Sequence, residues 1–356
     1  MNTTSSNSNL FEHHVKDLPF VYGGVTGKGV IRQCPEDFIV DEQLSFEPSG
    51  EGEHVFLLLK KTGLNTDSVA QTLAKFAQVK RMAVAYAGMK DRHAVTSQTF
   101  SVHLPGKESP NWALLEEPSL KILSTTRHRK KLKMGAIKAN HFAITVKNCQ
   151  LDEQALSDKV NEIGRKGVPN YFMEQRFGHY GHNLTLAHQI FSQQAAFKSK
   201  RIKGLMLSAV RSYLFNLVLA KRVTNLSWDK ALGGDAFILN GTRQFFIENK
   251  IDDTIVNRLL SHDIHPSGPL YGLGETAVCG VVEGLEGAVF DEYTVFCDGL
   301  VREKVDVSRR SLRVVPDNIT LENVNETTKR ISFNLPSGSY ATAVLRELFD
   351  TDIGND

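Results

Sequence analysis

Cysteine is scarce in this chain, and the few cysteines are too far apart to form a metal or redox site. The 356 residues include four of them, Cys34, Cys149, Cys279 and Cys297, and no two are close in the sequence. Zinc sites and dithiol redox sites both need closely spaced pairs. Scattered thiols in a long chain are typical of reduced proteins, so we expect a cytoplasmic protein without a metal site.

Long apolar runs and a strong net charge are also absent. No run reaches the ~18 apolar residues of a membrane-spanning helix, so we expect no membrane partner. Residues 1–9 are polar and uncharged and lack the basic and apolar regions of a secretory signal, which indicates a frayed tail. The net charge is only +2, so a surface that binds a polyanion must come from local clusters of Lys and Arg.

Hydrophobic residues make up 41% of the chain, which is enough for two ordinary domains with their own cores. Strand-like and separated helix-like segments are mixed, and this favours an α+β fold. One expected helix has Val69, Leu73 and Phe76 at helical spacing, with Thr66 as its expected cap. The other expected helices cover 152–164, 184–197, 207–223 and 340–349, and the expected strands cover 30–40, 54–60, 84–87, 98–103, 141–147 and 332–335.

A short segment between two of these strands concentrates three charges in a tight loop. Asp91 lies between Lys90 and Arg92, after Gly88 and before the strand-like run over 98–103. Opposite charges favour the ionised form of a carboxyl group. An ionised carboxylate held in a fixed loop suits nucleophilic or general-base chemistry. The alternative, which the charge pattern alone favours, is an ordinary loop with its charges in water.

Five stretches of the sequence resemble the motifs of one enzyme family. The segment from Gly88 to Gln98, Gly-Met-Lys-Asp-Arg-His-Ala-Val-Thr-Ser-Gln, is similar to the signature of the tRNA pseudouridine synthase D (TruD) family. Met173 stands where the family usually has Gly. The matches follow the family's order and extend over about residues 31–348, nearly the whole chain. The other four stretches are Pro35-Glu-Asp-Phe-Ile-Val-Asp-Glu42, Asn140-His-Phe142, Pro169-Asn-Tyr-Phe-Met-Glu-Gln-Arg-Phe-Gly178 and Phe333-Asn-Leu-Pro-Ser-Gly-Ser-Tyr-Ala-Thr342.

The resemblance implies a discontinuous domain organisation that composition alone does not show. Residues 1–165 and 317–356 would form a pseudouridine-synthase-type catalytic domain with a mixed or antiparallel sheet. Residues 166–316 would form a family-specific α+β insertion domain. We expect a V-shaped two-domain molecule that holds RNA between its domains.

The resemblance also implies an activity, the isomerisation of uridine 13 in the D arm of tRNA to pseudouridine. Asp91 matches the family's essential aspartate. Its carboxylate would either attack C1′ of the extruded nucleotide or remove the 2′ proton to give a glycal, and the sequence does not choose between them. The reaction needs no metal, redox step or small-molecule cofactor. The expected partner is tRNA, and the expected state is a monomer.

Five residues are implied to build the substrate pocket around Asp91. Arg32 occupies a position where the family usually has Lys, and its cation would pair with Asp91. Phe38, Asn140 and Phe333 match the family's uridine-pocket residues, and Phe142 fits the position of an active-site aromatic. Asn offers a donor and an acceptor to a uracil edge, and Phe offers a stacking face to a flipped base. Without the resemblance, Arg32 is a surface residue and each Phe is a core residue.

A basic stretch immediately precedes Asn140 and is the clearest phosphate-binding candidate. Residues 121–138 contain seven Lys or Arg and no acidic residue, a composition that suits the RNA backbone; a solvated charged face is the alternative. A second cluster covers 198–203. The residues that we expect on the RNA backbone are Arg127, Arg129, Lys130, Lys131 and Lys133.

Other patterns and functions fit less well. Gly272–Ala277 mimics a dinucleotide fingerprint but is expected to follow a loop instead of a strand. His179 and His182 lack partners at metal-ligand spacing. Two roles are open for the polar residues of the Pro169–Gly178 stretch: contact with RNA, or positioning of the interface between the domains. These residues are Asn170, Gln175 and Arg176. The alternative functions are a non-catalytic RNA-binding protein on the same fold and a nucleoside hydrolase, which usually needs a second carboxylate.

Overall fold

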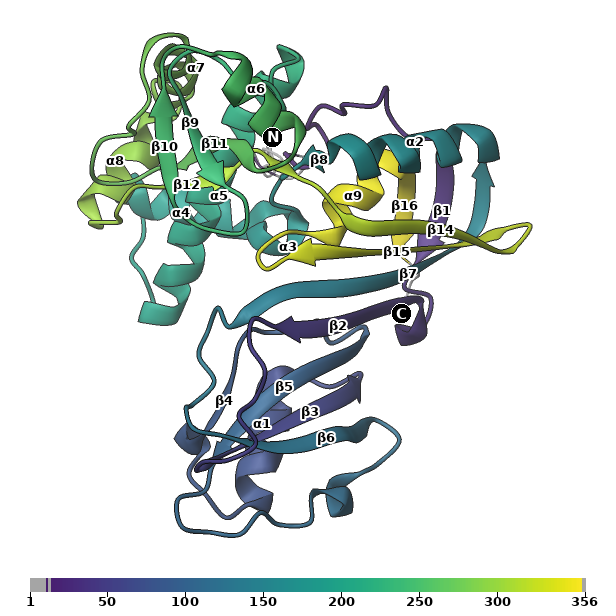
Figure 1. Ribbon diagram of the computed structural model, residues 1–356. Helices are drawn as coiled ribbons and strands as arrows, with labels where there is room; N and C mark the ends of the chain where they lie inside the picture. Colours follow the sequence, from purple (N-terminus) through teal and green to yellow (C-terminus); the bar gives the residue numbers. More distant parts are fainter. Residues whose placement is uncertain (1–10, 12–13, 354–356) are drawn as a thin grey trace, which may run out of the picture. The chain divides into compact units, whose positions relative to one another are not determined.

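The computed structural model describes Phe11 and residues 14–353, and it has an α+β fold as predicted (Figure 1). The predicted frayed tail, residues 1–9, lies outside the described residues. By its contacts the chain divides into two compact units. The sheet unit comprises the described residues of 25–165, 316–341 and 348–353, and the mixed unit comprises those up to Gly24, 166–315 and 342–347.

The boundaries differ from the expected 166–316 segment at the two ends of the chain. The described residues before Val25 and the helical residues 342–347 belong to the mixed unit. Hydrogen bonds within that unit explain this assignment. Arg346 donates to the backbone oxygens of Leu18 and Pro19, and a Glu347 carboxylate oxygen accepts from the backbone N–H of Val21 at 3.1 Å.

The sheet unit is built on one ten-stranded sheet with the order β14-β15-β7-β2-β5-β3-β6; β1 pairs with β7 and β16, and β4 pairs with β5. Only the β2–β5 and β1–β16 pairings are parallel. The strands are β1 Gly27–Ile31, β2 Phe38–Leu44, β3 His54–Thr62, β4 Val84–Tyr86, β5 Val95–His103, β6 Leu120–His128, β7 Ile137–Leu151, β14 Asp317–Asn325, β15 Thr328–Pro336 and β16 Phe349–Ile353.

Strand β7 organises the centre of this sheet because it pairs with β1, β2 and β15. Its side chains alternate, so that Phe142, Ile144 and Val146 are buried. The β15 register places Phe333 opposite Phe142, and the β2 register places Glu42 opposite Asn140. Three distant motifs therefore meet on one face of the sheet.

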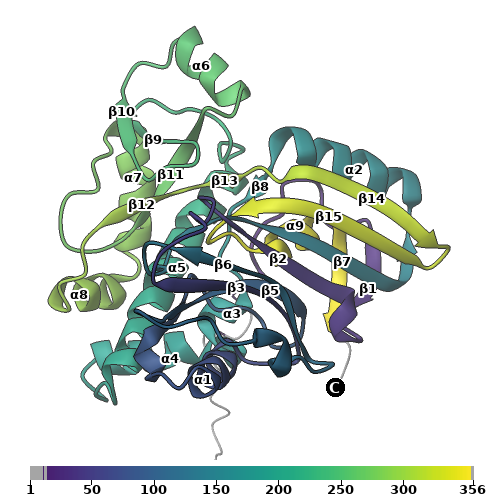
Figure 2. The same cartoon turned by 60° about the horizontal axis from the view of Figure 1, so that its bottom comes forward.

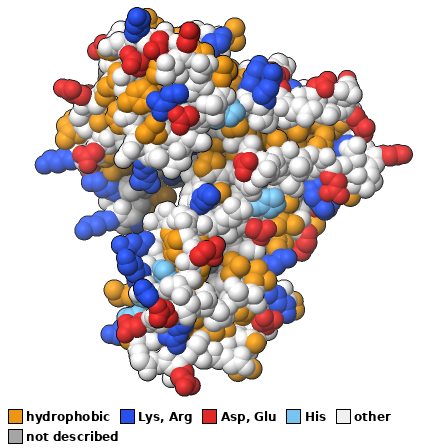
Figure 3. Space-filling view, viewed as in Figure 1, with side chains coloured by type: hydrophobic (Ala, Val, Ile, Leu, Met, Phe, Trp, Pro, Cys, Tyr) orange, Lys and Arg blue, Asp and Glu red, His pale blue; other side chains and the backbone are white. Residues whose placement is uncertain are grey.

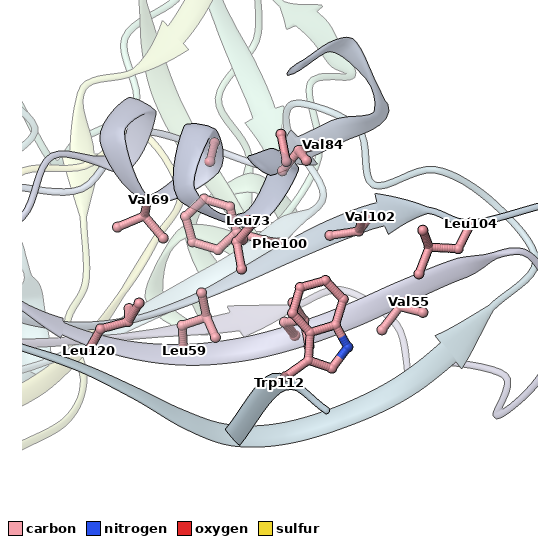
Figure 4. Packing of buried hydrophobic residues seen from close by; sticks show 13 residues of the cluster. Val55, Leu59, Val69, Leu73, Val84, Phe100, Val102, Leu104, Trp112 and Leu120 are labelled. Atoms are coloured by element: carbon pink, nitrogen blue, oxygen red, sulfur yellow. The ribbon is translucent and has the colours of Figure 1, made fainter. Parts of the chain in front are cut away.

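Helix α1 (Thr66–Phe76) covers the part of the sheet formed by β3, β5 and β6, and Figure 4 shows this core. Val69 and Leu73 of α1 pack with Phe100 and Trp112, and each of these four side chains is at most 3% exposed. Burying one such side chain stabilises the fold by about 1.5–3 kcal/mol. The predicted cap was wrong: Asn65 is the N-cap residue, and the Thr66 hydroxyl donates instead to Gln98 Oε1 at 3.1 Å.

Helix α2 (Glu153–Lys166) lies along β14 and β15 in Figures 1 and 2. Its buried face carries Leu156, Val160 and Ile163. At the start of the helix, Glu153 accepts a hydrogen bond at 2.5 Å from the buried ammonium group of Lys329 on β15. This end of the sheet is thus anchored to a helix that follows β7 directly.

The mixed unit is organised around α5 (Lys200–Thr224). By length and composition α5 could cross a membrane, but 56% of its most apolar window is buried inside the protein, as is typical of a core helix. The remaining elements with strands or helices in this unit are β8 Val168–Pro169, α3 Glu174–Phe177, α4 His182–Phe191, β9 Asp235–Leu239, β10 Phe245–Glu248, α6 Asp253–Leu260, β11 Ile264–Leu270, α7 Gly280–Phe290, α8 Thr294–Arg302, β12 Ser308–Ser311 and β13 Arg313–Val314, while α9 Ala341–Leu348 has most of its length here.

Two predictions for the mixed unit were wrong. The helix expected over 184–197 ends at Phe191, because Gln193 adopts a left-handed φ of 63° that the α-helix does not accommodate. The stretch before Gly272 is strand β11 instead of a loop. Gly272 itself is required for a close contact, because a Cβ there would lie 2.1 Å from the Val305 carbonyl oxygen. The close approach of these two backbone segments explains why residue 272 is a glycine, without any need for a bound phosphate.

Candidate active site

Asp91 lies in the loop between β4 and β5 of the sheet unit, and its side chain is 29% exposed. The Oδ1 atom accepts a hydrogen bond from the backbone N–H of His93 at 3.0 Å. The Oδ2 atom lies 2.7 Å from a terminal nitrogen of Arg32. The carboxylate is therefore fixed at both oxygens and still reaches solvent, as a reacting group must.

Arg32 provides the cation that was expected beside Asp91, and it does so from an unusual backbone conformation. It directly follows β1 and has a left-handed φ of 61°. Such a conformation costs a non-glycine residue about 1–3 kcal/mol. The guanidinium carbon lies 4.2 Å from the centre of the Phe38 ring, so a cation–π contact adds to the ion pair. These two contacts offset the backbone cost and aim the guanidinium at Asp91.

The cations next to Asp91 in the sequence are not its partners, contrary to the simplest interpretation of the charge pattern. Arg92 is exposed, and its Nε donates to the Gly63 carbonyl oxygen at 3.3 Å. Lys90 is directed into the protein, where its ammonium group lies 3.2 Å from Glu42 Oε2. Lys90 and Asp91 are adjacent in the loop but have different partners.

Lys90 and Glu42 form a buried ion pair whose side chains are 7% and 0% exposed. Burial raises the pKa of Glu42 and lowers that of Lys90, and the attraction between their charges opposes both shifts. Lys90 Nζ also donates a hydrogen bond to Asn140 Oδ1 at 2.5 Å. The loop that carries Asp91 is thereby connected to the strand that carries Asn140.

Lys61, near the end of β3, was missed by the sequence interpretation although it supports the same loop. Its side chain is buried, and its ammonium group donates to the backbone oxygens of Leu64 at 2.8 Å and of Asp91 at 3.1 Å. Burial lowers the pKa of Lys61 to about 8, although the negative charge of Asp91 acts in the opposite direction. The period of two along β3 places Lys61 on the same buried face as Leu57 and Leu59; this pattern could have identified it.

The predicted pocket aromatics lie on one face of the sheet, but they are largely buried. Phe38, Phe142 and Phe333 are 4%, 7% and 0% exposed. The rings of Phe38 and Phe142 are 6.3 Å apart, and those of Phe142 and Phe333 are 5.7 Å apart. Phe333 has no exposed surface, so in this conformation it packs against Phe142 from the interior of the protein. Asn140 is half-buried on the same face, two positions from Phe142.

The basic stretch is divided between tethered and free side chains. Arg127 donates to the backbone oxygens of Gly52 and Lys107, Arg129 pairs with Glu51, and Lys131 donates to the Met82 oxygen. Lys130 and Lys133 are exposed, and within the described residues their side chains have no hydrogen bond or ion pair. Figure 3 shows Lys and Arg side chains interspersed with acidic ones on the face that it presents. Of the five residues that we expect on the RNA backbone, Lys130 and Lys133 are thus the two that a phosphate can engage without breaking a contact within the described residues.

The Pro169–Gly178 motif belongs to the mixed unit, where two of its three polar candidates have structural contacts. Asn170 is buried, donates to the Ser311 carbonyl oxygen at 3.0 Å and accepts from Arg310 at 2.5 Å. Arg176 donates to Ser208 Oγ at 2.8 Å. Met173 has a φ of −104°, a value open to any residue, so its replacement of Gly causes no strain. Of the second cluster, Lys203 pairs with Glu303.

Comparison with known proteins places this arrangement in a family. The family model for tRNA pseudouridine synthase D (TruD) matches residues 20–196 and 182–348. Curated proteins named tRNA pseudouridine synthase D are similar over most of their length. That of Methylococcus capsulatus is 46% identical over 94% of this chain and 95% of its own, and that of Nitrosococcus oceani is 41% identical over 93% of each.

A solved structure agrees at the level of the fold. A crystal structure from Methanosarcina mazei, provisionally named tRNA pseudouridine synthase D, superposes with a TM-score of 0.71 over 93% of this chain and 95% of its own, at 23% identity. The family model and the curated relatives together cover the segments that build the Asp91 site. The chain therefore belongs to the tRNA pseudouridine synthase D (TruD) family.

Proposed function

We propose that this protein is a tRNA pseudouridine synthase that isomerises uridine 13 in the D arm, with Asp91 as the reacting carboxylate. Membership of the TruD family supports an isomerase acting on tRNA. The single structural observation that carries the proposal is the Asp91–Arg32 pair, in which a partly exposed carboxylate is held at 2.7 Å from a cation. The choice of position 13 rests on the motif resemblance.

The proposed reaction leaves the composition of the nucleotide unchanged. The N1–C1′ bond breaks, the uracil turns within the site, C5 bonds to C1′, C5 loses its proton to solvent, and N1 takes up a proton. Asp91 either forms a transient bond to C1′ that breaks when C5 attacks, or takes the 2′ proton and returns it to C2′. Arg32 keeps the carboxylate oriented throughout, since its guanidinium lies 2.7 Å from Asp91 Oδ2.

Access to the target base requires energy that the protein surface must supply. Extruding a paired or stacked nucleotide costs on the order of a few kcal/mol. Contacts between cations and phosphates offset such a cost. Lys130 and Lys133 support this part of the proposal, because both are exposed and uncommitted within the described part of the chain.

The geometry argues against a hydrolase. A glycosidase usually needs a second carboxyl group that reaches the substrate. Glu42, which lies next to the site through its contact with Lys90, has a side chain with 0% exposure and faces that lysine. It therefore does not reach a bound nucleotide in this conformation. A non-catalytic RNA-binding protein remains the second candidate, but binding alone gives no reason for the Asp91–Arg32 pair.

Release of tritium from tRNA that carries [5-³H]uridine tests the proposal. We expect release that is stoichiometric with pseudouridine and is abolished when uridine 13 is replaced by cytidine. Release that persists after this replacement would move the target to another position. Free uracil in place of tritium would identify a hydrolase, and binding without either product would identify the non-catalytic alternative.

A further inference from the structure

The side-chain amide of Asn140 has a defined direction. Its Oδ1 atom accepts a hydrogen bond from Lys90 Nζ at 2.5 Å. A lysine ammonium group has three donors and no acceptor, so only the oxygen of the amide can face it. The Nδ2 group must then point away from Lys90. Within the described residues Nδ2 has no hydrogen-bond partner, and Asn140 is only half-buried, so this donor is available to a ligand.

Lys90 is in turn held in place by Glu42. The Oε2 atom of Glu42 lies 3.2 Å from Lys90 Nζ, and its Oε1 atom accepts a hydrogen bond from the backbone N–H of Thr99 at 3.3 Å. The β2–β7 register sets Glu42 directly opposite Asn140. A carboxylate, an ammonium group and an amide therefore follow one another from inside the sheet unit toward the site.

The backbone of Lys90 is fixed as well as its side chain. Its N–H donates to Thr66 Oγ1 at 3.1 Å, and that hydroxyl donates to Gln98 Oε1 at 3.1 Å. The amide nitrogen of Gln98 donates to the Gly88 carbonyl oxygen. Both ends of Lys90 are thus restrained, and the ammonium group has little freedom to leave Asn140.

Stability gives a poor account of this arrangement. Removing two charges from water is expensive, and apolar residues of similar volume often replace a buried ion pair without loss of stability. The better-attested use of buried charges is to enforce one conformation. Here the conformation that the pair enforces is the orientation of the Asn140 amide, which Lys90 links to the loop that carries Asp91.

We propose that Glu42 and Lys90 are positioning residues that make Asn140 donate an N–H to a carbonyl oxygen of the extruded base. This inference rests on the proposed function and extends it to the choice of base. A uracil offers carbonyl oxygens as acceptors, whereas a base with an amino group at that point would present a donor to a donor. Opposed donors are strongly disfavoured in a site that excludes water. The amide thus selects for a carbonyl-bearing base.

The test replaces both charges together, so that neither is left buried and unpaired. The variant with Glu42→Leu and Lys90→Met keeps similar volumes and frees the Asn140 amide to rotate. Single-turnover tritium release gives the rate constant, and filter binding gives the affinity for tRNA. The matched control is the variant with Glu153→Gln and Lys329→Met, which removes another ion pair of the sheet unit, formed at 2.5 Å with the lysine side chain 2% exposed.

We expect the Glu42/Lys90 variant to lose about tenfold or more in rate, with tRNA affinity unchanged and the control as active as wild type. Adding Asn140→Ala to the Glu42/Lys90 variant should then cost less than about threefold, because the same interaction is already lost. A smaller loss from the Glu42/Lys90 variant overturns the inference, as does a larger further loss from Asn140→Ala.

A second variant keeps the inference testable if the Glu42/Lys90 variant does not fold, which its thermal unfolding will show. Asn140→Asp retains an oxygen for Lys90 and removes the outward N–H donor. We expect it to be as impaired as Asn140→Ala, and full activity would overturn the inference. A wild-type protein that releases no tritium would instead refute the proposed function itself, which separates the two failures.

Discussion

The guanidinium group of Arg32 lies 2.7 Å from the Asp91 carboxylate and 4.2 Å from the centre of the Phe38 ring. One side chain thus joins the carboxylate that we propose as the reacting group to the aromatic that the resemblance implies for the substrate pocket. Arg32 reaches this position because the chain leaves β1 with a left-handed φ. Arg32 therefore offers a charge to Asp91 and a planar face to Phe38, and single substitutions can separate these two contributions.

Asp91→Asn should abolish turnover. The amide keeps the shape and the contact with the His93 N–H, but it is neither a nucleophile nor a base at neutral pH. Affinity for tRNA should stay within several-fold of wild type, because phosphate contacts dominate binding. Tritium release and filter binding measure the two quantities on the same preparation. An active Asn variant would remove Asp91 from the chemistry.

Arg32→Lys should retain activity within about tenfold, whereas Arg32→Met should lose about a hundredfold or more. A lysine restores the charge beside Asp91 but not the planar guanidinium that covers Phe38. Methionine removes the charge and leaves the carboxylate without its cation, an interaction worth about 1.5–3 kcal/mol when charge-assisted. Single-turnover rates of the two variants distinguish charge from shape. Equal activity of both would show that the ion pair is dispensable.

Lys130→Ala combined with Lys133→Ala should weaken tRNA binding and reduce its dependence on salt. Each lost phosphate contact lowers the slope of log affinity against log salt concentration by about 0.7–0.9. Titrations at several salt concentrations measure this slope. Lys121→Ala is the matched control, because Lys121 already pairs with Glu116 at 3.4 Å. If the double variant and the control have the same slope, the loop does not contact the RNA backbone.

Lys61→Met should alter how stability depends on pH. Burial lowers the pKa of Lys61 from its ordinary value of 10.5 to about 8, so the unfolded chain holds the proton to a higher pH than the folded protein. The penalty for burying the charged lysine is complete below about pH 8 and disappears as the pH approaches about 10.4. The wild type should therefore gain up to about 3 kcal/mol relative to the variant between pH 7 and pH 10.5.

Urea denaturation at four pH values measures this difference in the free energy of unfolding. Lys60→Met provides the control, because Lys60 is the exposed neighbour on the same strand. Its difference from wild type should not change with pH. A constant difference for Lys61→Met as well would mean that Lys61 keeps an ordinary pKa in the folded protein.

Sequence motifs pointed to the candidate residues of the site but to only one of the contacts that hold them. Asp91, Asn140 and Phe333 come from distant motifs, and the sheet registers bring the strands of the last two together. The cation for Asp91 was predicted correctly as Arg32, since the family pattern places a basic residue there. The RNA contacts, the uridine-pocket roles and the V shape stay predictions.

Local sequence patterns could not show the direction in which a side chain points. Lys90 and Arg92 both flank Asp91, and only the structure reveals that Lys90 turns inward to Glu42. The Thr66 hydroxyl fits a helix cap by type, but it donates to Gln98 Oε1 on strand β5. The helix after residue 182 was extended too far because the sequence does not show the left-handed φ of Gln193. In each case a tertiary contact or one backbone angle outweighs local propensity.

The parallel pairing of β1 with β16 and the antiparallel pairing of β15 with the long strand β7 have a consequence for biosynthesis. The ribosome synthesises β1 and β7 early. Their partners β16 and β15 follow only after the whole of 166–315 has been translated. Until residues 328–353 emerge, β1 lacks its parallel neighbour and β7 presents an open edge, which exposes nascent protein to aggregation. The sheet whose β4–β5 loop carries Asp91 is thus completed only after residues 328–353 have been synthesised.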